Sequence, residues 1–448
     1  MPNITINDES VHTFLESLDL SKHPLVKSRR KLAKEYYSAL AHIVYSTINQ
    51  RRIPNEKTYR YISGILQIYS DTFHLSPSEL NTVEDIGLDY HIDFFAKPWR
   101  KKYFNILLCD IALVLLNRNL YLQAMDIISQ KAPKRIQNSI VQMGTFIIDE
   151  QAIDSKHLYL LPLFQQYQMN SRFLLQKERR IIITANMSAG KSMLINALVG
   201  KSVARTSQEV CTGNICYIYN KAFEDGRVNL ETRNLCLGAS SEDLINYDWD
   251  GKISISSYFS PVAATIPRLC LIDTPGVDAA LHKEHGKRTR ESLLHDTYDI
   301  VLYVVSPTRL GTDAEKKHLK WISENISKEK IIFILNKLDD FHVFSDSVEE
   351  SVQGFRNDLI NLGFENPVIC PTSAYFAFLL KKKMNGQAFS DDEADEYEFL
   401  SKKFMRNSYD LSSYYNNSQC LPNDTEELVL SKRSGLYGIE QLIYGGAI

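Results

Sequence analysis

Hydrophobic residues recur in the first 175 residues at the spacing of amphipathic helices. Apolar side chains follow one another three or four positions apart over residues 25–48, and the same rhythm returns over 58–73. Such spacing collects the apolar side chains on one face of a helix. Further helices are predicted over residues 101–117, 119–130, 134–148 and 159–177. The pattern therefore predicts an all-α N-terminal domain over residues 1–175.

The pattern changes near residue 178, where short apolar runs begin to alternate with amphipathic stretches. The runs are rich in β-branched residues and are bounded by polar turns. This alternation is typical of an α/β fold with a mostly parallel sheet and helices on both faces. The predicted core strands are 181–185, 269–273, 331–335 and 368–370. Shorter segments at 215–219, 227–232 and 252–258 alternate in polarity and predict extra antiparallel strands, so we expect an α/β domain with an expanded sheet over residues 176–385.

The last part of the chain, residues 386–448, is more polar. Its composition predicts a polar connection, followed by a short amphipathic helix over Leu436–Tyr444. We expect this helix to pack near the α/β domain or the N-terminal domain. It would either transmit a signal to the N-terminal helices or simply cover exposed apolar surface.

The first strand of the α/β domain leads into a phosphate-binding sequence. Residues 181–192 read Ile-Ile-Ile-Thr-Ala-Asn-Met-Ser-Ala-Gly-Lys-Ser, the strand–loop–helix order of a P-loop, although Ala185 replaces its first glycine. Backbone N–H groups and the helix N-terminus bind phosphate in such a loop. Lys191 is expected to reach the β- and γ-phosphates, and the Ser192 hydroxyl to ligate Mg²⁺. The other residues predicted to line the nucleotide here are Asn186, Met187, Ser188, Ala189, Gly190 and Met193.

Three further loops follow predicted strands and complete a nucleotide site. In Asp273-Thr-Pro-Gly276, Asp273 would hold Mg²⁺ through water and the Gly276 N–H would meet the γ-phosphate. The loop 336–339 reads Asn-Lys-Leu-Asp, and its carboxylate can accept two hydrogen bonds from guanine, whereas adenine offers no such donor pair. The guanine-site residues predicted from this loop and from the loop after 368–370 are Asn336, Lys337, Asp339, Ser373 and Ala374. Their order along the chain predicts that the protein binds GTP.

The block Asn186–Gly200 resembles dynamin-like GTPases, especially the bacterial members. The long interval before Asp273, the 336–339 loop and the closing Ser434-Gly435-Leu436 extend the resemblance over about residues 178–448. The resemblance implies hydrolysis of GTP·Mg²⁺ to GDP and phosphate, stimulated by a homodimer of GTPase domains or by a separate dynamin-like or helical partner subunit. The N-terminal domain resembles TerB-like helical bundles only weakly.

The resemblance also assigns catalytic roles. Thr212, which directly precedes a strand-like run, would be the switch-I threonine that closes over Mg²⁺, with Thr206 as the alternative. Dynamins use a Gln–Ser pair in the P-loop; Ser188 is retained here, but Met187 replaces the glutamine. Val277 stands where Ras-like proteins have the glutamine that orients water. Catalysis would then rest on Ser188, Lys191 and Thr212, with Ser188 also able to help bind a monovalent cation, K⁺ or Na⁺, and we expect slow intrinsic turnover.

Composition narrows the cellular setting. The net charge of −3 carries no nucleic-acid signature, and the seven cysteines lack metal-site spacing, which indicates reduced thiols in a cytoplasmic protein. The sequence predicts no membrane-spanning segment, but the basic and aromatic run 97–103 would suit a peripheral membrane contact. The sequence leaves three functions open for such a GTPase. They are a self-assembling mechanoenzyme at membranes, a regulatory switch such as a ribosome- or chromosome-associated GTPase, and a GTP-binding scaffold with negligible hydrolysis.

Overall fold

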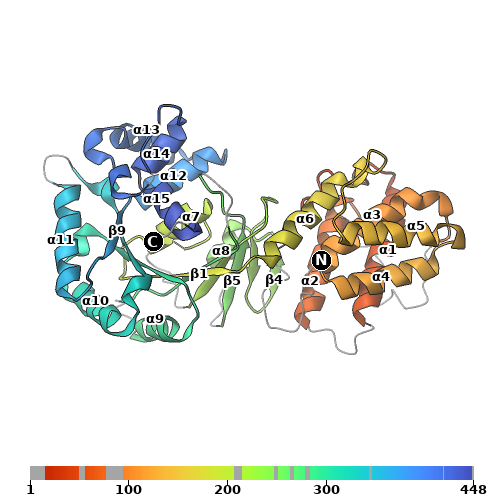
Figure 1. Ribbon diagram of the computed structural model, residues 1–448, viewed down its shortest axis with the longest axis horizontal. Helices are drawn as coiled ribbons and strands as arrows, with labels where there is room; N and C mark the ends of the chain where they lie inside the picture. Colours follow the sequence, from red (N-terminus) through yellow and green to blue (C-terminus); the bar gives the residue numbers. More distant parts are fainter. Residues whose placement is uncertain are drawn as a thin grey trace. The chain divides into compact units, whose positions relative to one another are not determined.

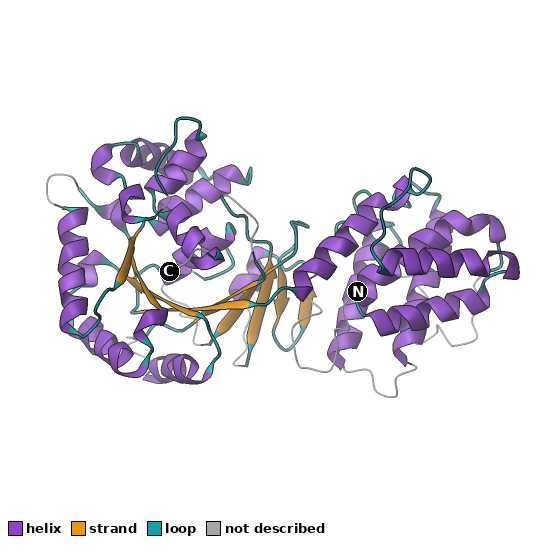
Figure 2. Ribbon diagram, in the orientation of Figure 1, coloured by secondary structure: helices purple, strands orange, loops and turns teal. Residues whose placement is uncertain are grey.

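The computed structural model describes residues 16–49, 56–76, 94–205, 214–246, 251–262, 267–277, 283–342, 346–416 and 418–445. The chain forms two compact units, one helical and one built on a β-sheet (Figures 1 and 2). The first unit comprises Met1–Gln176 together with two short later segments, Ala222–Arg227 and Leu235–Leu237. The second unit comprises Lys177–Lys221, Val228–Asn234 and Gly238–Ile448.

The first unit confirms the predicted all-helical N-terminal region. Its helices are α1 (Arg30–Asn49), α2 (Glu56–Thr72), α3 (Lys101–Leu115), α4 (Arg118–Lys131), α5 (Lys134–Ile148) and α6 (Leu161–Leu175). Helix α3 packs against α1, α4, α5 and α6, and all its residues from Phe104 onward are buried. A helix that is apolar on all sides belongs in the centre of a bundle. Within the described ranges, no helix combines the length and the apolar character needed to cross a bilayer.

A buried carboxylate joins three parts of this helical unit. Asp110 of α3 lies 2.9 Å from His23 Nε2 and accepts hydrogen bonds from the hydroxyls of Tyr36 and, at 3.0 Å, Tyr69. His23 Nδ1 accepts the backbone N–H of Leu25 at 3.1 Å, which assigns the ring proton to Nε2. Because three donors from different segments end at one carboxylate, the network fixes how α1, α2 and α3 pack together.

The helical unit also holds the segment Ala222–Arg227. Ser17 Oγ donates to the Phe223 carbonyl at 2.6 Å, and the Leu18 N–H donates to Asp225 Oδ2 at 3.0 Å. Arg227 Nη1 returns a bond to the Leu18 carbonyl at 2.5 Å. These contacts attach Ser17 and Leu18 to residues that lie more than two hundred positions later in the chain.

Within the described residues, the sheet has nine strands in the order β4-β3-β5-β2-β6-β1-β7-β8-β9, and all but the edge strand β4 belong to the second unit. Strands β6, β1, β7, β8 and β9 are parallel, which confirms the predicted mostly parallel α/β fold. The strands are β1 (Arg179–Ala185), β2 (Cys216–Asn220), β3 (Asn229–Glu231), β4 (Leu235–Leu237), β5 (Ile253–Ser257), β6 (Leu269–Asp273), β7 (Ile300–Val305), β8 (Ile331–Leu335) and β9 (Val368–Pro371).

The added strands between the P-loop and β6 differ partly from the expectation. Strand β2 is antiparallel to β6, and β3 is antiparallel to β5, as predicted. However, β2 and β5 pair in parallel, Cys216 opposite Ile253. The alternation of polar and apolar residues is the same in parallel and antiparallel strands, so this pattern cannot decide strand direction.

Helices cover both faces of the sheet (Figure 1). Helices α7 and α12 pack together on one face, where α13, α14 and α15 gather around them, and α9, α10 and α11 cover the other face. The helices of this unit are α7 (Lys191–Val199), α8 (Ser241–Asn246), α9 (Lys283–His295), α10 (Asp313–Asn325), α11 (Val348–Asn361), α12 (Ala374–Met384), α13 (Asp391–Phe404), α14 (Glu426–Arg433) and α15 (Leu436–Tyr444). The α15 bounds coincide with the predicted C-terminal helix.

Candidate nucleotide-binding site

The turn between β1 and α7 is shaped by residues in the left-handed region. Ser188 has φ 64° and Gly190 has φ 89°. A β carbon on Gly190 would lie 2.2 Å from Asn336 Nδ2, so only glycine fits there. Gly190 is also the N-cap of α7 and supplies no side-chain hydrogen bond to the helix. The first N–H groups of α7 are thus left for an anion at the positive end of the helix dipole.

Lys191 and Asp273 meet at the centre of the site. The Lys191 ammonium, at the start of α7, forms an ion pair with the Asp273 carboxylate at the end of β6. Their side chains are only 9% and 2% exposed. Ser192 follows on α7 and is partly buried, as is Met193. A hydroxyl and a carboxylate are oxygen donors of the kind that Mg²⁺ prefers, so the donor set here fits that ion.

The segment after β6 runs beside the P-loop. The Val277 N–H donates to the Ala185 carbonyl at 3.3 Å, and Thr274 Oγ1 donates to the Ile183 carbonyl at 2.8 Å. Gly276 faces Met187, because a β carbon on that glycine would lie 2.9 Å from Met187 Cγ. The predicted γ-phosphate contact is therefore placed next to the P-loop. The two apolar side chains at positions 187 and 277 cannot orient a water molecule.

Asn336 connects the P-loop to the loop after β9. Its Nδ2 donates to the Ala189 carbonyl at 3.0 Å, and its Oδ1 accepts the Ala374 N–H at 2.9 Å. The side chain is almost completely buried, so both bonds are shielded from water. One amide thus holds the phosphate loop and a predicted guanine loop at a fixed separation.

Asp339 lies in a short turn after β8 and is positioned from two sides. Its Oδ1 accepts a hydrogen bond from Ser373 Oγ at 2.6 Å, and its backbone carbonyl accepts one from Lys403 Nζ at 2.5 Å. Burial raises the pKa of Asp339, while the Ser373 hydrogen bond acts in the opposite direction. Lys337 adopts the left-handed conformation at φ 69°. The predicted guanine-site residues are thus joined in two pairs, Asp339 with Ser373 and Asn336 with Ala374, at the carboxyl ends of β8 and β9.

The proposed switch-I residues, Thr212 and its alternative Thr206, lie outside the described residues.

A buried polar group beneath the P-loop was missed by sequence reasoning. Asn186 Nδ2 donates to Glu315 Oε2 at 2.7 Å, and the Tyr303 hydroxyl donates to Glu315 Oε1 at 2.5 Å. On the same helix, His318 Nε2 lies 3.3 Å from Thr184 Oγ1, and burial lowers the pKa of His318 to about 3. The sequence feature that could have revealed them is helical spacing, because Glu315 and His318 lie on the same buried face of the amphipathic helix α10 as Leu319 and Ile322.

Comparison with known proteins identifies the family of the domain that holds these loops. A sequence model described as the dynamin family matches residues 181–338, which include the P-loop, Asp273 and the start of the 336–339 loop. The chain contains a dynamin-family GTPase domain. In its described part, Asn336 hydrogen-bonds both the P-loop and the loop after β9.

Two curated relatives match part of this chain. A probable transmembrane GTPase FZO-like, chloroplastic, of Arabidopsis thaliana is 24% identical over 215 residues, which cover 47% of this chain and 21% of that protein. Dynamin-like protein A of Bacillus subtilis is 30% identical over 169 residues, which cover 36% of this chain and 14% of that protein. The matched segment therefore spans about a fifth or less of each relative.

Solved structures of bacterial dynamins also align with the chain. One of them belongs to an oligomerised bacterial dynamin pair described as a mechanism for long-range sensing and tethering of membranes. It aligns with a TM-score of 0.37 and 16% identity, covering 85% of this chain and 58% of that one. A second structure of such a pair aligns with a TM-score of 0.36 and 15% identity, covering 84% and 68%.

Proposed function

We propose that this protein binds GTP·Mg²⁺ and hydrolyses GTP to GDP and phosphate. The bridge made by Asn336 carries this proposal, because it joins the P-loop to a guanine loop beside the paired Lys191 and Asp273. Lys191 would neutralise the phosphates, and Ser192 and Asp273 would hold Mg²⁺. The bound ion would supply charge neutralisation at the β- and γ-phosphates. Asp339 would accept the two guanine donors.

Base specificity provides the first test. An Asp339→Asn variant replaces one carboxylate acceptor with an amide donor, which suits the 2-oxo group of xanthine better than the 2-amino group of guanine. We expect the affinity for a fluorescent GDP analogue to fall about a hundredfold and that for the xanthine analogue to rise. Asp340→Asn is a matched control, since Asp340 is the exposed neighbour. Equal GDP binding by both variants would contradict the guanine assignment.

Hydrolysis is proposed to be slow in a single GTPase domain and faster when two domains associate or a partner binds. Met187 and Val277 support this, because neither side chain can position the attacking water. Ser188 and Thr212 would assist, with K⁺ or Na⁺ beside the phosphates as an added positive charge. The test is GTP turnover per molecule over a hundredfold range of protein concentration, in potassium and in sodium buffer, with Lys191→Ala as the inactive reference. A rising specific activity supports activation by association.

The same two apolar side chains favour a second candidate, a GTP-binding scaffold with negligible hydrolysis. Met187 lies against Gly276, where a water-orienting side chain would be needed. A flat and very low rate at every concentration, with GTP binding intact, would support the scaffold and exclude self-activation.

A peripheral membrane contact has one structural observation in its favour. Trp99, in the helical unit, is 76% exposed and is followed by the exposed Lys101 and Lys102. An exposed indole beside cations suits the surface of an anionic bilayer. Co-sedimentation with vesicles containing phosphatidylserine should then decrease in a Trp99→Ala variant. Binding that is unchanged by this substitution would exclude Trp99 as the contact.

A further inference from the structure

The turn between α14 and α15 contacts the loop that holds the guanine-binding carboxylate. The Ser434 carbonyl accepts a hydrogen bond from Thr372 Oγ1 at 2.9 Å and another from the Ser373 N–H at 3.2 Å. Ser373 in turn donates to Asp339 Oδ1 at 2.6 Å. Only Ser373 therefore stands between the Ser434 carbonyl and the Asp339 carboxylate, which is the group proposed to bind guanine.

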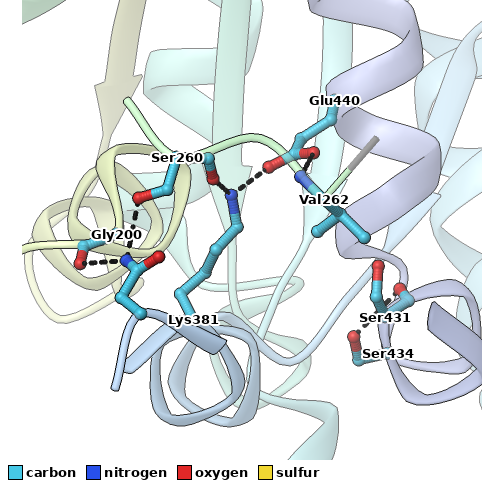
Figure 3. Close-up of polar contacts among 8 residues, drawn as sticks. Gly200, Ser260, Val262, Lys381, Ser431, Ser434 and Glu440 are labelled. Atoms are coloured by element: carbon cyan, nitrogen blue, oxygen red, sulfur yellow. Dashed lines mark hydrogen bonds and ion pairs between the residues drawn. The ribbon is translucent and has the colours of Figure 1, made fainter. Parts of the chain in front are cut away.

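Glycine at position 435 is what allows this approach. Gly435 has φ 84°, and a β carbon there would lie 2.4 Å from the Pro371 carbonyl oxygen and 2.7 Å from the Tyr415 hydroxyl. Tyr415 itself donates to the Pro371 carbonyl at 2.5 Å. Ser434 Oγ donates to the Ser431 carbonyl at 3.1 Å, which closes the turn (Figure 3). Any other residue at position 435 would push the turn away from the end of β9.

The far part of α15 is fixed by a buried ion pair. Glu440 pairs with Lys381 of α12 at 2.5 Å, and their side chains are 0% and 1% exposed. Glu440 also accepts the Val262 N–H at 2.9 Å, and Lys381 donates to the Ser260 carbonyl (Figure 3). Helix α15 packs on α7 as well, which is the helix of the P-loop. With both its start and its middle held, α15 keeps the Ser434 carbonyl in place.

We propose that the Ser434–Gly435 turn is a positioning element of the guanine-binding site. Its role is to hold Thr372 and Ser373 so that Ser373 fixes the Asp339 carboxylate for both guanine donors. The proposal rests on the proposed GTP binding. If the turn moves, Asp339 loses its orientation, and the discrimination between guanine and a base with one donor fewer decreases. A turn that only supported the fold would leave that discrimination unchanged.

The test compares GDP with IDP, whose hypoxanthine lacks the 2-amino group of guanine. We expect Gly435→Ala to weaken GDP binding about tenfold and to reduce the ratio of GDP to IDP affinity severalfold. Gly386→Ala is the matched control: Gly386 also has a left-handed φ, 64°, but a β carbon there meets nothing within 4 Å. The GDP affinity of this control, and its ratio of GDP to IDP affinity, should equal those of the unmodified protein.

A milder variant keeps the test valid if Gly435→Ala does not fold. Thr372→Val removes one hydrogen bond to Ser434 with little change in shape, and we expect about a threefold loss of GDP affinity with the same reduced ratio. A lower melting temperature with an unchanged GDP to IDP ratio in every folded variant would overturn the proposal. If the unmodified protein binds neither nucleotide, the proposed GTP binding fails instead.

Discussion

Asn186 and Glu315 are joined across the base of the P-loop by a hydrogen bond of 2.7 Å from the amide nitrogen to Oε2. Glu315 comes from α10, on the opposite face of the sheet from α7, and is only 1% exposed. The first residue of the phosphate loop is therefore held by a group that would itself never touch phosphate. Such support from behind the loop fixes its shape before nucleotide binds.

Removing the Glu315 carboxylate should be costly. In Glu315→Ala, the Asn186 amide and the Tyr303 hydroxyl lose their acceptor inside the protein, so we expect the free energy of unfolding to fall by about 2–5 kcal/mol. GDP affinity should fall too, since the P-loop loses its support. Tyr303→Phe is the control, because it removes one bond and should cost about 1 kcal/mol. Urea unfolding measures the loss of unfolding free energy in both variants. Equal losses would contradict the role of Glu315 as the shared acceptor beneath the P-loop.

The stability of the second unit should depend on pH through His318. Burial lowers the pKa of His318 from 6.5 to about 3, so below pH 6.5 the unfolded state binds a proton that the folded state does not. The stability present above pH 6.5 is then lost as the pH falls toward 3, by at most about 1.4 kcal/mol per pH unit. His318→Gln should flatten the dependence between pH 6 and 4, measured by urea unfolding. His342→Gln, at an exposed site, should leave the slope unchanged.

Guanine binding should weaken in acid, and the pH at which it weakens should be higher than for a site whose aspartate has the ordinary pKa. Burial raises the pKa of Asp339 above 3.8, and only the ionised carboxylate can accept both guanine donors. GDP affinity should therefore be full above the raised pKa and fall as the pH decreases through it. Ser373→Ala removes the hydrogen bond that lowers this pKa, so its midpoint should lie higher still. Fluorescent GDP titrations between pH 4 and 7 would show this, and identical midpoints would refute it.

The Lys381–Glu440 pair should behave as a buried ion pair. Lys381→Met leaves the Glu440 charge buried without its cation, and we expect a loss of about 3–5 kcal/mol in the free energy of unfolding. Adding Glu440→Leu should recover much of that loss, since the unpaired charge is removed. Lys402→Met is the control, because both side chains of its pair with Glu398 are exposed and water screens that pair, so its loss should leave the free energy of unfolding nearly unchanged. If Lys381→Met and Lys402→Met changed the free energy of unfolding by similar amounts, the Lys381–Glu440 pair would have to be accessible to water in solution.

The residues at strand ends could be predicted because local pattern fixes them. An apolar run followed by Gly, Asp or Asn–Lys–x–Asp specifies both the strand and the loop, and Lys191, Asp273 and Asn336 followed from that alone. The boundaries of α5 followed from helical spacing after Pro133. The order of the loops along the chain predicted GTP binding, whereas the dynamin-like assignment came from the resemblance of Asn186–Gly200 and the later motifs to that family.

The supporting contacts could not be predicted, because they join distant parts of the chain. Asn186 and Glu315 are 129 residues apart, and Lys381 and Glu440 are 59 apart. Neither local spacing nor helical periodicity says which buried polar residue meets which. The prediction of antiparallel added strands was wrong for β2 and β5 for the same reason, since the direction in which two strands pair depends on the whole sheet.

The attachment of Ser17 and Leu18 to Ala222–Arg227 has a consequence for synthesis. The donor and acceptor of the Ser17–Phe223 bond are 206 residues apart, with β1, the P-loop and β2 between them. A chain emerging from the ribosome presents its N-terminal helices first, yet these lack their last partners until the segment after β2 has been made. The helical unit begins the chain but is completed only when translation has passed the first phosphate-binding loop, so its folding overlaps with that of the GTPase domain.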